Sequence, residues 1–383
     1  MVDMFKKISL FCVFAVLFAL TGCFSAAAAD RPIVSAKSAV VYCVNNGEVI
    51  YEENARESLP MASTTKILSA LLACESGQLS REITVTNQMA AVEGSSMGLL
   101  PGDRVTLRGL IYGMLLDSGN DAANTAAIAL CGNTAAFAEL MNRRAAEIGM
   151  EDSHFVNPSG LPDDAHYSTA YDMAILTAEA LRNDVFAEVC RTQTAVVWYG
   201  NPPYRRVLTN HNRLLKEYED CIGVKTGFTK KAGRCLVSAA ARDGITLIAV
   251  TLNDPDDWAD HRTLLEYGFS LCASRRFTPD VAEAAVTVTG GEKTRLSVTC
   301  VGQTVLVDGG EASAVSAEIL APRFLYAPVQ KGDIVGSVVI YDGATEVGRL
   351  PLIAAESVAV SAPKQEKPSV FSAIKDFLKG LFR

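Results

Sequence analysis

The sequence predicts an α+β fold: an antiparallel sheet flanked by helices with an inserted helical region, followed by a small all-β domain. Two observations lead to this prediction. A β-hairpin pattern near the start and β-rich runs after residue 223 enclose a series of helical patterns. From Val281 to about Ile353 the chain then has only short β-rich runs, separated by Gly, Asp and Pro and without a helical period.

The composition is that of a soluble globular protein. Of 383 residues, 49% are hydrophobic and 20% are charged, and the formal net charge is −8. The acidic balance and the lack of a basic stretch in the sequence argue against nucleic-acid binding. The chain is long enough for two or three domains of ordinary size.

Residues 1–29 have the pattern of a signal peptide. Lys6 and Lys7 form a short basic region, and an apolar run at 8–20 is too short to cross a bilayer comfortably. The small residues at 26–29 offer a cleavage site before Asp30, and they disfavour a retained membrane anchor. A second interpretation is that Leu20-Thr21-Gly22-Cys23 resembles a bacterial lipobox, with Cys23 lipidated. Either ending predicts an exported protein in the cell wall space or at the outer face of the cytoplasmic membrane.

The early elements follow from local patterns. Residues 38–51 predict a hairpin, because β-rich residues flank the turn signal Asn45-Asn46-Gly47. Residues 60–73 predict a helix, because apolar residues recur at helical spacing after Pro60 and Glu75-Ser76-Gly77 supplies a stop. A short strand is expected at 83–86. Further helices are expected at 107–116, 121–130, 137–148, 171–181 and 261–271.

Later strands are expected at 223–226, 236–240 and 245–251, the first two joined by a loop at 227–233. The character changes near 276–279, so we expect a catalytic domain at 30–276 and a small all-β domain at 277–360. Strands in the second domain are expected at 285–289, 295–300, 305–307, 334–341 and 347–352.

Residues 361–368 read as a polar linker, and 369–383 combine an apolar helical face with Lys375, Lys379 and Arg383. A basic amphipathic helix after a linker is typical of an in-plane membrane anchor. The alternative is a helix packed on the body of the protein. The linker and the terminal position favour the membrane anchor, so the membrane surface is an expected partner of this helix.

Three short motifs carry the chemistry. Ser63 and Lys66 are three residues apart on a predicted helix, so they share a face and the amine can reach the hydroxyl. A serine hydroxyl needs such a base to become a nucleophile, and a helix N-terminus favours the developing negative charge. Alone, this segment is better explained by Ser63 capping the helix. The motifs Ser118-Gly119-Asn120 and Lys225-Thr226-Gly227 follow in order and change that judgement.

With the segments 60–66, 116–122, 154–161 and 223–227, the chain resembles the D-alanyl-D-alanine carboxypeptidase family, the low-molecular-mass penicillin-binding proteins. The resemblance covers roughly residues 36–352 and the C-terminal anchor. It implies a β-lactamase/transpeptidase-like fold and removal of the terminal D-alanine from peptidoglycan stem peptides. It also implies covalent inhibition by β-lactam antibiotics such as penicillin, with no cofactor and no metal.

The resemblance also implies a role for each motif residue. Ser63 is the acyl-ester nucleophile, and a neutral Lys66 is its base. Ser118 relays a proton to the leaving D-alanine, and Asn120 holds Lys66 and the substrate amide. Lys225 lowers the pKa of Lys66 by its charge and attracts the substrate carboxylate.

The remaining site residues belong to the third motif. Thr226 is expected to assist in carboxylate binding. The oxyanion hole is expected from the backbone N–H groups of Ser63 and Phe228, the latter just past Gly227. Some relatives have histidine after this motif, so Phe228 is a departure that can alter substrate preference and leaves the backbone donor intact.

Other conspicuous residues have structural interpretations. The four histidines are scattered, and Trp198, Tyr199 and Tyr204 suit surface packing as well as a peptide cleft. Arg234 suits a carboxylate contact or a solvated surface equally. Cysteines in apolar runs are expected to be small buried residues, and a Cys221–Cys235 disulfide across a hairpin is the less favoured interpretation.

Two other functions compete with the carboxypeptidase. A serine β-lactamase needs a carboxylate for fast deacylation, and no acidic motif follows Ser118-Gly119-Asn120. A catalytically idle wall-binding protein would have no reason to keep all three motifs.

Overall fold

The computed structural model describes residues 31–277, 279–281, 284–308, 315–342 and 345–362. It divides into two compact units, Met1–Cys272 and Ala273–Arg383. The predicted signal peptide and the predicted membrane helix lie outside the described residues. Among those that are described, no helix is both long enough and apolar enough to cross a bilayer.

A five-stranded antiparallel sheet forms the base of the first unit, with the order β2-β1-β9-β8-β7. The predicted hairpin and the three later strands of this domain are confirmed. The strands are β1 (Ser38–Cys43), β2 (Val49–Glu53), β7 (Cys221–Thr229), β8 (Gly233–Arg242) and β9 (Ile245–Leu252).

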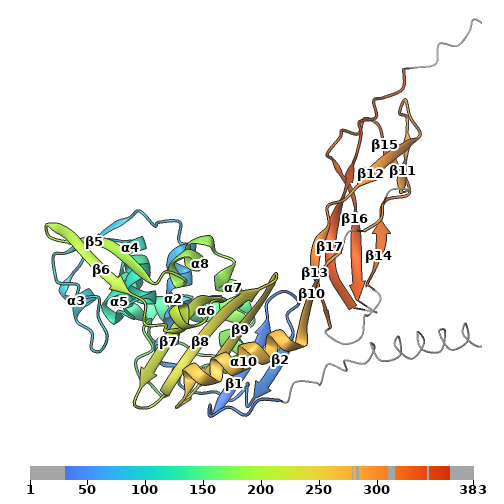
Figure 1. The fold of residues 1–383 in the computed structure, drawn as a ribbon. Helices are drawn as coiled ribbons and strands as arrows, with labels where there is room; N and C mark the ends of the chain where they lie inside the picture. Colours follow the sequence, from blue (N-terminus) through green and yellow to red (C-terminus); the bar gives the residue numbers. More distant parts are fainter. Residues whose placement is uncertain (1–30, 278, 282–283, 309–314, 343–344, 363–383) are drawn as a thin grey trace, which may run out of the picture. The chain divides into compact units, whose positions relative to one another are not determined.

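Two helices cover opposite faces of this sheet (Figure 1). Neighbouring residues of a strand point to opposite faces. In β1, Val41 faces α10 (Asp257–Leu271), where a Cβ added at Gly268 would lie 3.1 Å from Val41 Cγ1. Tyr42 instead makes an edge-on ring contact with Tyr171 of α7 (Ala170–Leu181), at 6.5 Å between centroids. The result is a sheet between one helix and a larger helical region.

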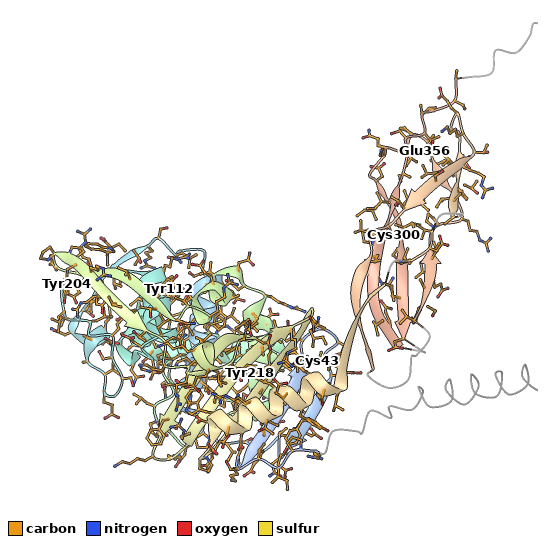
Figure 2. The ribbon with its side chains drawn as sticks, in the orientation of Figure 1. Cys43, Tyr112, Tyr204, Tyr218, Cys300 and Glu356 are labelled. Atoms are coloured by element: carbon orange, nitrogen blue, oxygen red, sulfur yellow. The ribbon has the colours of Figure 1, made fainter. Side chains whose placement is uncertain are left out.

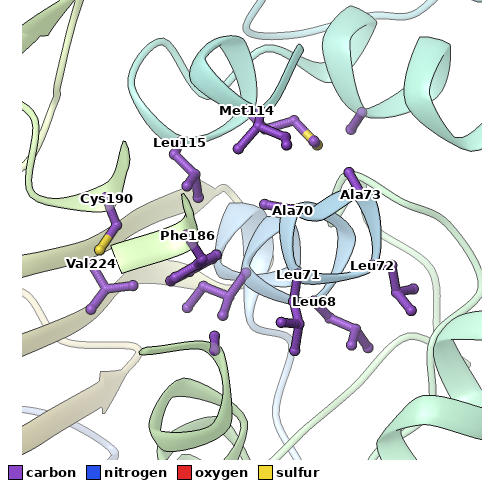
Figure 3. Close-up of a cluster of buried hydrophobic side chains, with 14 of the residues drawn as sticks. Leu68, Ala70, Leu71, Leu72, Ala73, Met114, Leu115, Phe186, Cys190 and Val224 are labelled. Carbon is purple, nitrogen blue, oxygen red and sulfur yellow. The ribbon is translucent and has the colours of Figure 1, made fainter. Parts of the chain in front are cut away.

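The helical region is built around α2 (Lys66–Glu75), every residue of which is buried except Glu75. A helix with little exposed surface is apolar on all sides, which explains why 67–74 contain no charge. Figure 3 shows Leu68, Leu71 and Leu72 among side chains from neighbouring elements. These neighbours include α4 (Leu107–Leu115), α5 (Asn120–Cys131), α6 (Thr134–Ile148), α8 (Asp184–Cys190) and β7. The helix that begins with Lys66 is therefore held inside the domain core.

The start of the helix predicted at 60–73 differs from the prediction. Residues Ala62–Thr65 form a 3-10 turn, η1, and the α-helix begins only at Lys66. Ala62 has a φ of +49°, which an α-helix does not permit. Ser63 therefore lies in the tighter turn that precedes α2, one turn from Lys66.

A second, four-stranded sheet has the order β3-β4-β5-β6. The prediction found β3 (Glu82–Thr84) but missed β4 (Arg104–Thr106), β5 (Thr194–Gly200) and β6 (Pro203–Thr209), and it also missed α8. The turn between β5 and β6 consists of Asn201 and Pro202. Apolar residues on both faces of β5 hid the alternation that marks a strand, because Val196 and Trp198 are exposed while Val197 and Tyr199 are buried. The short helices α3 (Asn87–Ala90) and α9 (Leu214–Glu217) complete this unit.

In the second unit, the described residues form strands and no helix, as predicted. A six-stranded sheet has the order β14-β16-β17-β12-β11-β15, and β10 pairs with β13. The core includes Leu296, Val338, Ile340 and Leu352, all fully buried. The strands are β10 (Cys272–Phe277), whose first residue belongs to the first unit, β11 (Ala285–Thr289), β12 (Arg295–Thr299), β13 (Gln303–Asp308), β14 (Val315–Leu320), β15 (Leu325–Tyr326), β16 (Ile334–Asp342) and β17 (Thr345–Ala354). Of these, β10, β14 and β15 were not predicted.

Strand register separates the two cysteines considered for a disulfide. Cys221 lies opposite Ala240, whereas Cys235 lies opposite Gly227 on the same strand as Cys221. The two cysteines are therefore several residues apart along the β7–β8 hairpin and do not bond. In the described residues, none of the eight cysteines forms a disulfide.

Candidate active site

Ser63 and Lys66 meet at the junction of η1 and α2. Nζ of Lys66 lies 2.9 Å from Oγ of Ser63, the contact that the three-residue spacing predicts. The Lys66 side chain is completely buried. The pair thus places an amine against a hydroxyl inside the protein and not in solvent.

Two further oxygen atoms surround the amine of Lys66. Asn120 Oδ1 lies 2.6 Å from Nζ, and the backbone oxygen of Ser159 lies 2.7 Å from it. Both oxygens can only accept hydrogen bonds. A neutral amine has two N–H groups for these acceptors and one lone pair, which is left to accept the O–H of Ser63. The three contacts therefore fit an unprotonated lysine acting as a base.

The electrostatic environment also favours an unprotonated Lys66. Burial is the largest cause that lowers the pKa of Lys66 well below its usual value, and the charge of Lys225 adds to it. The carboxylate of Asp121 opposes this by raising the pKa. The sequence hypothesis named Lys225 alone, because burial of an amine cannot be read from a motif.

Ser118 and Asn120 enter the site from the start of α5. Ser118 has a φ of +57°, a left-handed conformation that is uncommon without glycine and marks a constrained turn. Asn120 is the first residue of α5, and its Nδ2 donates to the backbone oxygen of Glu93 at 2.7 Å. With Nδ2 held there, Oδ1 is the atom turned toward Lys66.

Lys225 reaches the same site from β7. Its Nζ lies 3.0 Å from Oγ of Ser118 and 2.8 Å from the backbone oxygen of Thr226. The side chain is 1% exposed, and burial lowers the pKa of Lys225 from 10.5 to about 7. Side-chain contacts therefore link all three motifs. Lys66 contacts Ser63 and Asn120, and Lys225 contacts Ser118.

Gly227 allows β7 to lie against the nucleophile turn. A Cβ at Gly227 would lie 3.0 Å from the backbone nitrogen of Ser63 and 3.1 Å from that of Thr64. These distances are shorter than ordinary contacts of a side chain, so glycine permits the approach. Phe228 follows with a side chain that is 66% exposed, and its backbone is the expected second donor of the oxyanion hole.

The segment 154–161 has a role that the sequence did not reveal. Asn157 Oδ1 accepts hydrogen bonds from the backbone N–H groups of Ser159, Gly160 and Leu161, which fixes the Ser159 carbonyl on Lys66. Gly160 has a φ of +85°, and a Cβ there would lie 1.8 Å from the Ala62 carbonyl oxygen. The motif was quoted for its resemblance, but a main-chain contact leaves no side-chain signature to predict.

His166 supports the helix that carries Lys66. Its Nδ1 accepts the N–H of Val156 at 3.0 Å, so the proton resides on Nε2, which lies 2.8 Å from Thr65 Oγ1. Burial lowers the pKa of His166 to about 4. The ring is neutral and holds the nucleophile turn in position, in agreement with a structural interpretation.

The remaining conspicuous residues lie in structural contacts. His261 is fully buried between Ser238 and Thr251, and its pKa is lowered by burial to about 3. Arg234 forms an ion pair with buried Asp257 at 2.7 Å. This contact favours a structural role for Arg234 over a contact with the substrate carboxylate. Tyr199 is buried and donates to the Met97 carbonyl, whereas Trp198 and Tyr204 are exposed on the β5–β6 hairpin. In the described part of the chain, no group of His, Cys, Asp and Glu side chains could hold a metal ion.

Comparisons with known proteins match both units. Residues 25–256 match the model of the D-alanyl-D-alanine carboxypeptidase family, and residues 280–360 match the penicillin-binding protein 5 C-terminal domain. The carboxypeptidase DacF of Bacillus subtilis is 32% identical, covering 84% of this chain and 86% of its own. The crystal structure of the carboxypeptidase DacD from Francisella tularensis has a TM-score of 0.63 at 26% identity, over 90% of this chain and 98% of that one. The Streptomyces K15 DD-transpeptidase structure has a TM-score of 0.60 at 30% identity, over 63% and 99%.

The fold and the site define a serine hydrolase with a β-lactamase/transpeptidase-like catalytic domain and an added all-β domain. More narrowly, the chain belongs to the D-alanyl-D-alanine carboxypeptidase family.

Proposed function

We propose that this protein is a serine-type D-Ala-D-Ala carboxypeptidase, which removes the terminal D-alanine from peptidoglycan stem peptides. The observation that carries the proposal is the set of contacts around Lys66: one hydroxyl that can donate and two oxygens that only accept. This set suits a neutral amine, and a neutral amine is what activates a serine.

Acylation begins when the peptide carboxylate binds Lys225 with help from Thr226. Ser63 transfers its proton to Lys66 as its oxygen attacks the carbonyl carbon of the penultimate residue. The backbone N–H groups of Ser63 and Phe228 stabilise the oxyanion. The carbon–nitrogen bond then breaks, and the departing amine of D-alanine takes a proton through Ser118, which leaves an ester on Ser63.

Deacylation returns the enzyme when water attacks the ester and gives up its proton to Lys66. The ester bond breaks, the shortened peptide leaves, and Ser63 recovers its hydrogen. Penicillin follows the same acylation, since its β-lactam amide opens onto Ser63. Its leaving nitrogen stays attached to the adduct and obstructs water, so the acyl-enzyme persists.

A β-lactamase is the less favoured alternative. In the described part of the chain, Lys66 contacts two amide oxygens and a hydroxyl, and no carboxylate. The nearby carboxylate of Asp121 is committed to Ser96 and to the backbone N–H groups of Met97 and Leu99. Among the described residues, the side chains of Ser63 and Lys66 therefore contact no carboxylate that could act as an efficient base for hydrolysing the drug ester.

The experiment combines labelled penicillin with a D-alanine release assay on a D-Ala-D-Ala peptide. A long-lived adduct on Ser63 together with D-alanine release supports the carboxypeptidase. Rapid drug turnover would support a β-lactamase instead, and a chain that neither binds penicillin nor releases D-alanine would be an idle wall-binding protein.

Transpeptidation is a second candidate reaction, because a structural neighbour bears the name of a DD-transpeptidase. The acyl-enzyme would then be attacked by an amine and not by water. Adding an amine acceptor to the peptide assay separates the two. Release of D-alanine with a hydrolysed peptide indicates the carboxypeptidase, and a peptide joined to the acceptor indicates transfer.

We also propose that the chain is exported through residues 1–29 and tethered at the outer face of the cytoplasmic membrane by residues 369–383. The basic and apolar pattern of each segment supports this. Removing 369–383 should move the protein from the membrane fraction to the soluble fraction, while removing the polar linker 361–368 alone should not. Mass spectrometry of the mature N-terminus tests whether it begins at a lipidated Cys23 or near Asp30.

A further inference from the structure

Two cysteine side chains meet at the end of the first unit, on elements that supply none of the site residues. Cys43 is the last residue of β1, and Cys272 directly follows the last turn of α10. Their side chains are hydrogen-bonded to each other. Figure 2 labels Cys43 beside the C-terminal end of α10. Both residues belong to the first compact unit.

The packing of α10 on β1 explains this meeting. Strand β9 is antiparallel to β1, and α10 returns along the sheet after β9, so α10 and β1 run in the same direction. The helix lies close to the strand at Gly268, where a Cβ would lie 3.1 Å from Val41 Cγ1. Cys43 is two residues beyond Val41, a step of about 7 Å on the same face of the strand. Cys272 is four residues beyond Gly268, a step of about 6 Å on the same side of the helix. Because the two steps are similar in length and direction, Cys43 and Cys272 lie side by side at the ends of their elements.

The start of the helix confirms this direction. Ser35, just before β1, places its Oγ 2.8 Å from Oδ2 of Asp260, in the first turn of α10. Contacts between β1 and α10 thus run in parallel order along both elements. The approach of Cys43 and Cys272 is a consequence of the whole packing and not of one side-chain conformation.

The environment of Cys43 differs from that of other cysteines. The hydrogen bond from Cys272 is the largest cause that lowers the pKa of Cys43 to about 7, and the backbone N–H groups of Asn45 and Asn46 add to it against the effect of burial. Burial raises the pKa of six others: Cys74, Cys131, Cys190, Cys221, Cys235 and Cys300. Cys43 therefore supplies a thiolate near neutral pH, and the thiolate is the form that attacks disulfides.

We propose that Cys43 and Cys272 are a modification site, at which a small-molecule disulfide such as oxidised glutathione converts the two thiols to an intramolecular disulfide. Cys43 is fully buried and Cys272 only partly, so the reagent enters at Cys272. Cys272 first passes its proton to the Cys43 thiolate, and its sulfur then attacks one reagent sulfur, so that the first glutathione leaves as a thiolate. Cys43 gives the proton up to that glutathione and attacks the Cys272 sulfur, and the second glutathione leaves. Two protein thiols are oxidised, one reagent disulfide is reduced, and the two protons end on the released thiols.

The bond would join the end of β1 to the end of α10 and close a long stretch of chain. Such a bond destabilises the unfolded chain and raises Tm, by roughly 5–15 °C for a unit of this size. Export, as proposed above, would place the protein where disulfides persist. The inference itself rests only on the two side chains and is tested on the purified chain.

The experiment maps the cysteines of the full chain after incubation in oxidised and reduced glutathione at pH 7.5. Ten cysteines are present, so free thiols are blocked with a maleimide and the linked peptides are identified by mass spectrometry without reduction. We expect one linked pair, containing Cys43 and Cys272. Cys43→Ser should accumulate glutathione on Cys272, and Cys272→Ser should carry none on Cys43.

Cys190 and Cys221 serve as a matched internal control. They lie on the contacting elements α8 and β7, but their sulfurs face different backbone oxygens, Ile222 at 3.5 Å and Gly223 at 3.2 Å. Burial raises their pKa values to about 12 and 11, so they should stay reduced. The proposal is overturned if wild type yields no Cys43–Cys272 peptide in excess oxidant, or if Cys190–Cys221 links as readily. The wild-type map depends on no substitution, so a variant that fails to fold leaves the test intact.

Discussion

Asn120 Oδ1 lies 2.6 Å from Nζ of Lys66, and its amide nitrogen is held by the backbone oxygen of Glu93. The amide can therefore present only an acceptor to the amine. An amide oxygen attracts a lysine proton far less than a carboxylate does. An asparagine at this position therefore favours an unprotonated Lys66 amine.

The first prediction concerns Asn120→Asp. A carboxylate beside Lys66 raises the pKa of the amine, so acylation by penicillin should slow by roughly 100-fold at pH 7, in the range that loss of a general base produces. Stopped-flow labelling across pH measures this. The rate should partly recover at high pH, where Lys66 loses its proton. Asn124→Asp, one turn along α5, is the control and should label at the wild-type rate.

The second prediction concerns pH and substrate binding. The pKa of Lys225 is about 7 in the free enzyme, so the fraction carrying a charge falls as pH rises through 7. KM for a peptide with a free terminal carboxylate should therefore rise above pH 7. The pH profile of KM for a peptide amide should lack this rising limb. In Lys225→Arg the charge persists, and the limb should disappear from the pH profile of KM. An unchanged limb in that variant would assign it to another group.

Linkage gives a third prediction, on stability. The folded pKa of Lys225 lies below its unfolded value of 10.5, so the unfolded chain binds more protons between pH 7 and 10.5. The contribution of this residue to the free energy of unfolding should rise with pH over that window. Urea titrations of wild type and Lys225→Met at pH 7 and pH 9 measure it. The wild type should gain stability relative to the variant at the higher pH, and a relative loss would contradict the assignment.

The fourth prediction concerns the loop that supplies the Ser159 carbonyl. Gly160→Ala adds a Cβ that would meet the Ala62 oxygen at 1.8 Å, so the loop or the nucleophile turn must move. Penicillin acylation should fall at least 10-fold with a lowered Tm. Gly149→Ala is the matched control, with a φ of +93° and nothing within 4 Å of the added Cβ. It should show only the conformational cost, of about 1 kcal/mol, with normal acylation. Equal acylation rates in the two variants would show that the loop does not position Lys66.

The fifth prediction separates His166 from catalysis. Its pKa of about 4 lies below its unfolded value of 6.5, so the unfolded chain binds more protons between these values. Stability should fall as pH falls from 6.5 through 4, and less so in His166→Gln. Near pH 7 the ring is already neutral, so the variant should keep the wild-type shape of the pH–rate profile. A lost limb near neutral pH would make His166 a participant in proton transfer.

The sequence predicted the site better than the details of the fold. The spacing of Ser63 and Lys66 predicts their contact, because residues three apart lie on the same face of an α-helix or a 3-10 helix. The resemblance carried by the three ordered motifs predicted that Asn120 and Lys225 would join them. The strands of the five-stranded sheet were predicted for a similar reason, because Asn45-Asn46-Gly47 and the apolar run 245–251 are strong local signals.

What could not be predicted depends on contacts between distant segments. The Ser159 carbonyl has no side-chain signature, and the burial that lowers the pKa of Lys66 and Lys225 comes from the packing of α2 and β7. Strand β5 was missed because both of its faces are apolar. The meeting of Cys43 with Cys272 arises from the direction in which α10 returns along β1. Neither cysteine belongs to a recognisable spacing.

The central claim is that Ser63 becomes reactive through an unprotonated Lys66. Its most direct test is the rate of acylation by penicillin, followed by intact-mass spectrometry, in wild type, Ser63→Ala and Lys66→Gln between pH 5 and 9. The account predicts one adduct per wild-type chain, located on Ser63, no adduct in Ser63→Ala, and a rate reduced by at least 1,000-fold in Lys66→Gln at every pH. An adduct that forms on Ser63→Ala, or wild-type acylation by Lys66→Gln, would contradict it.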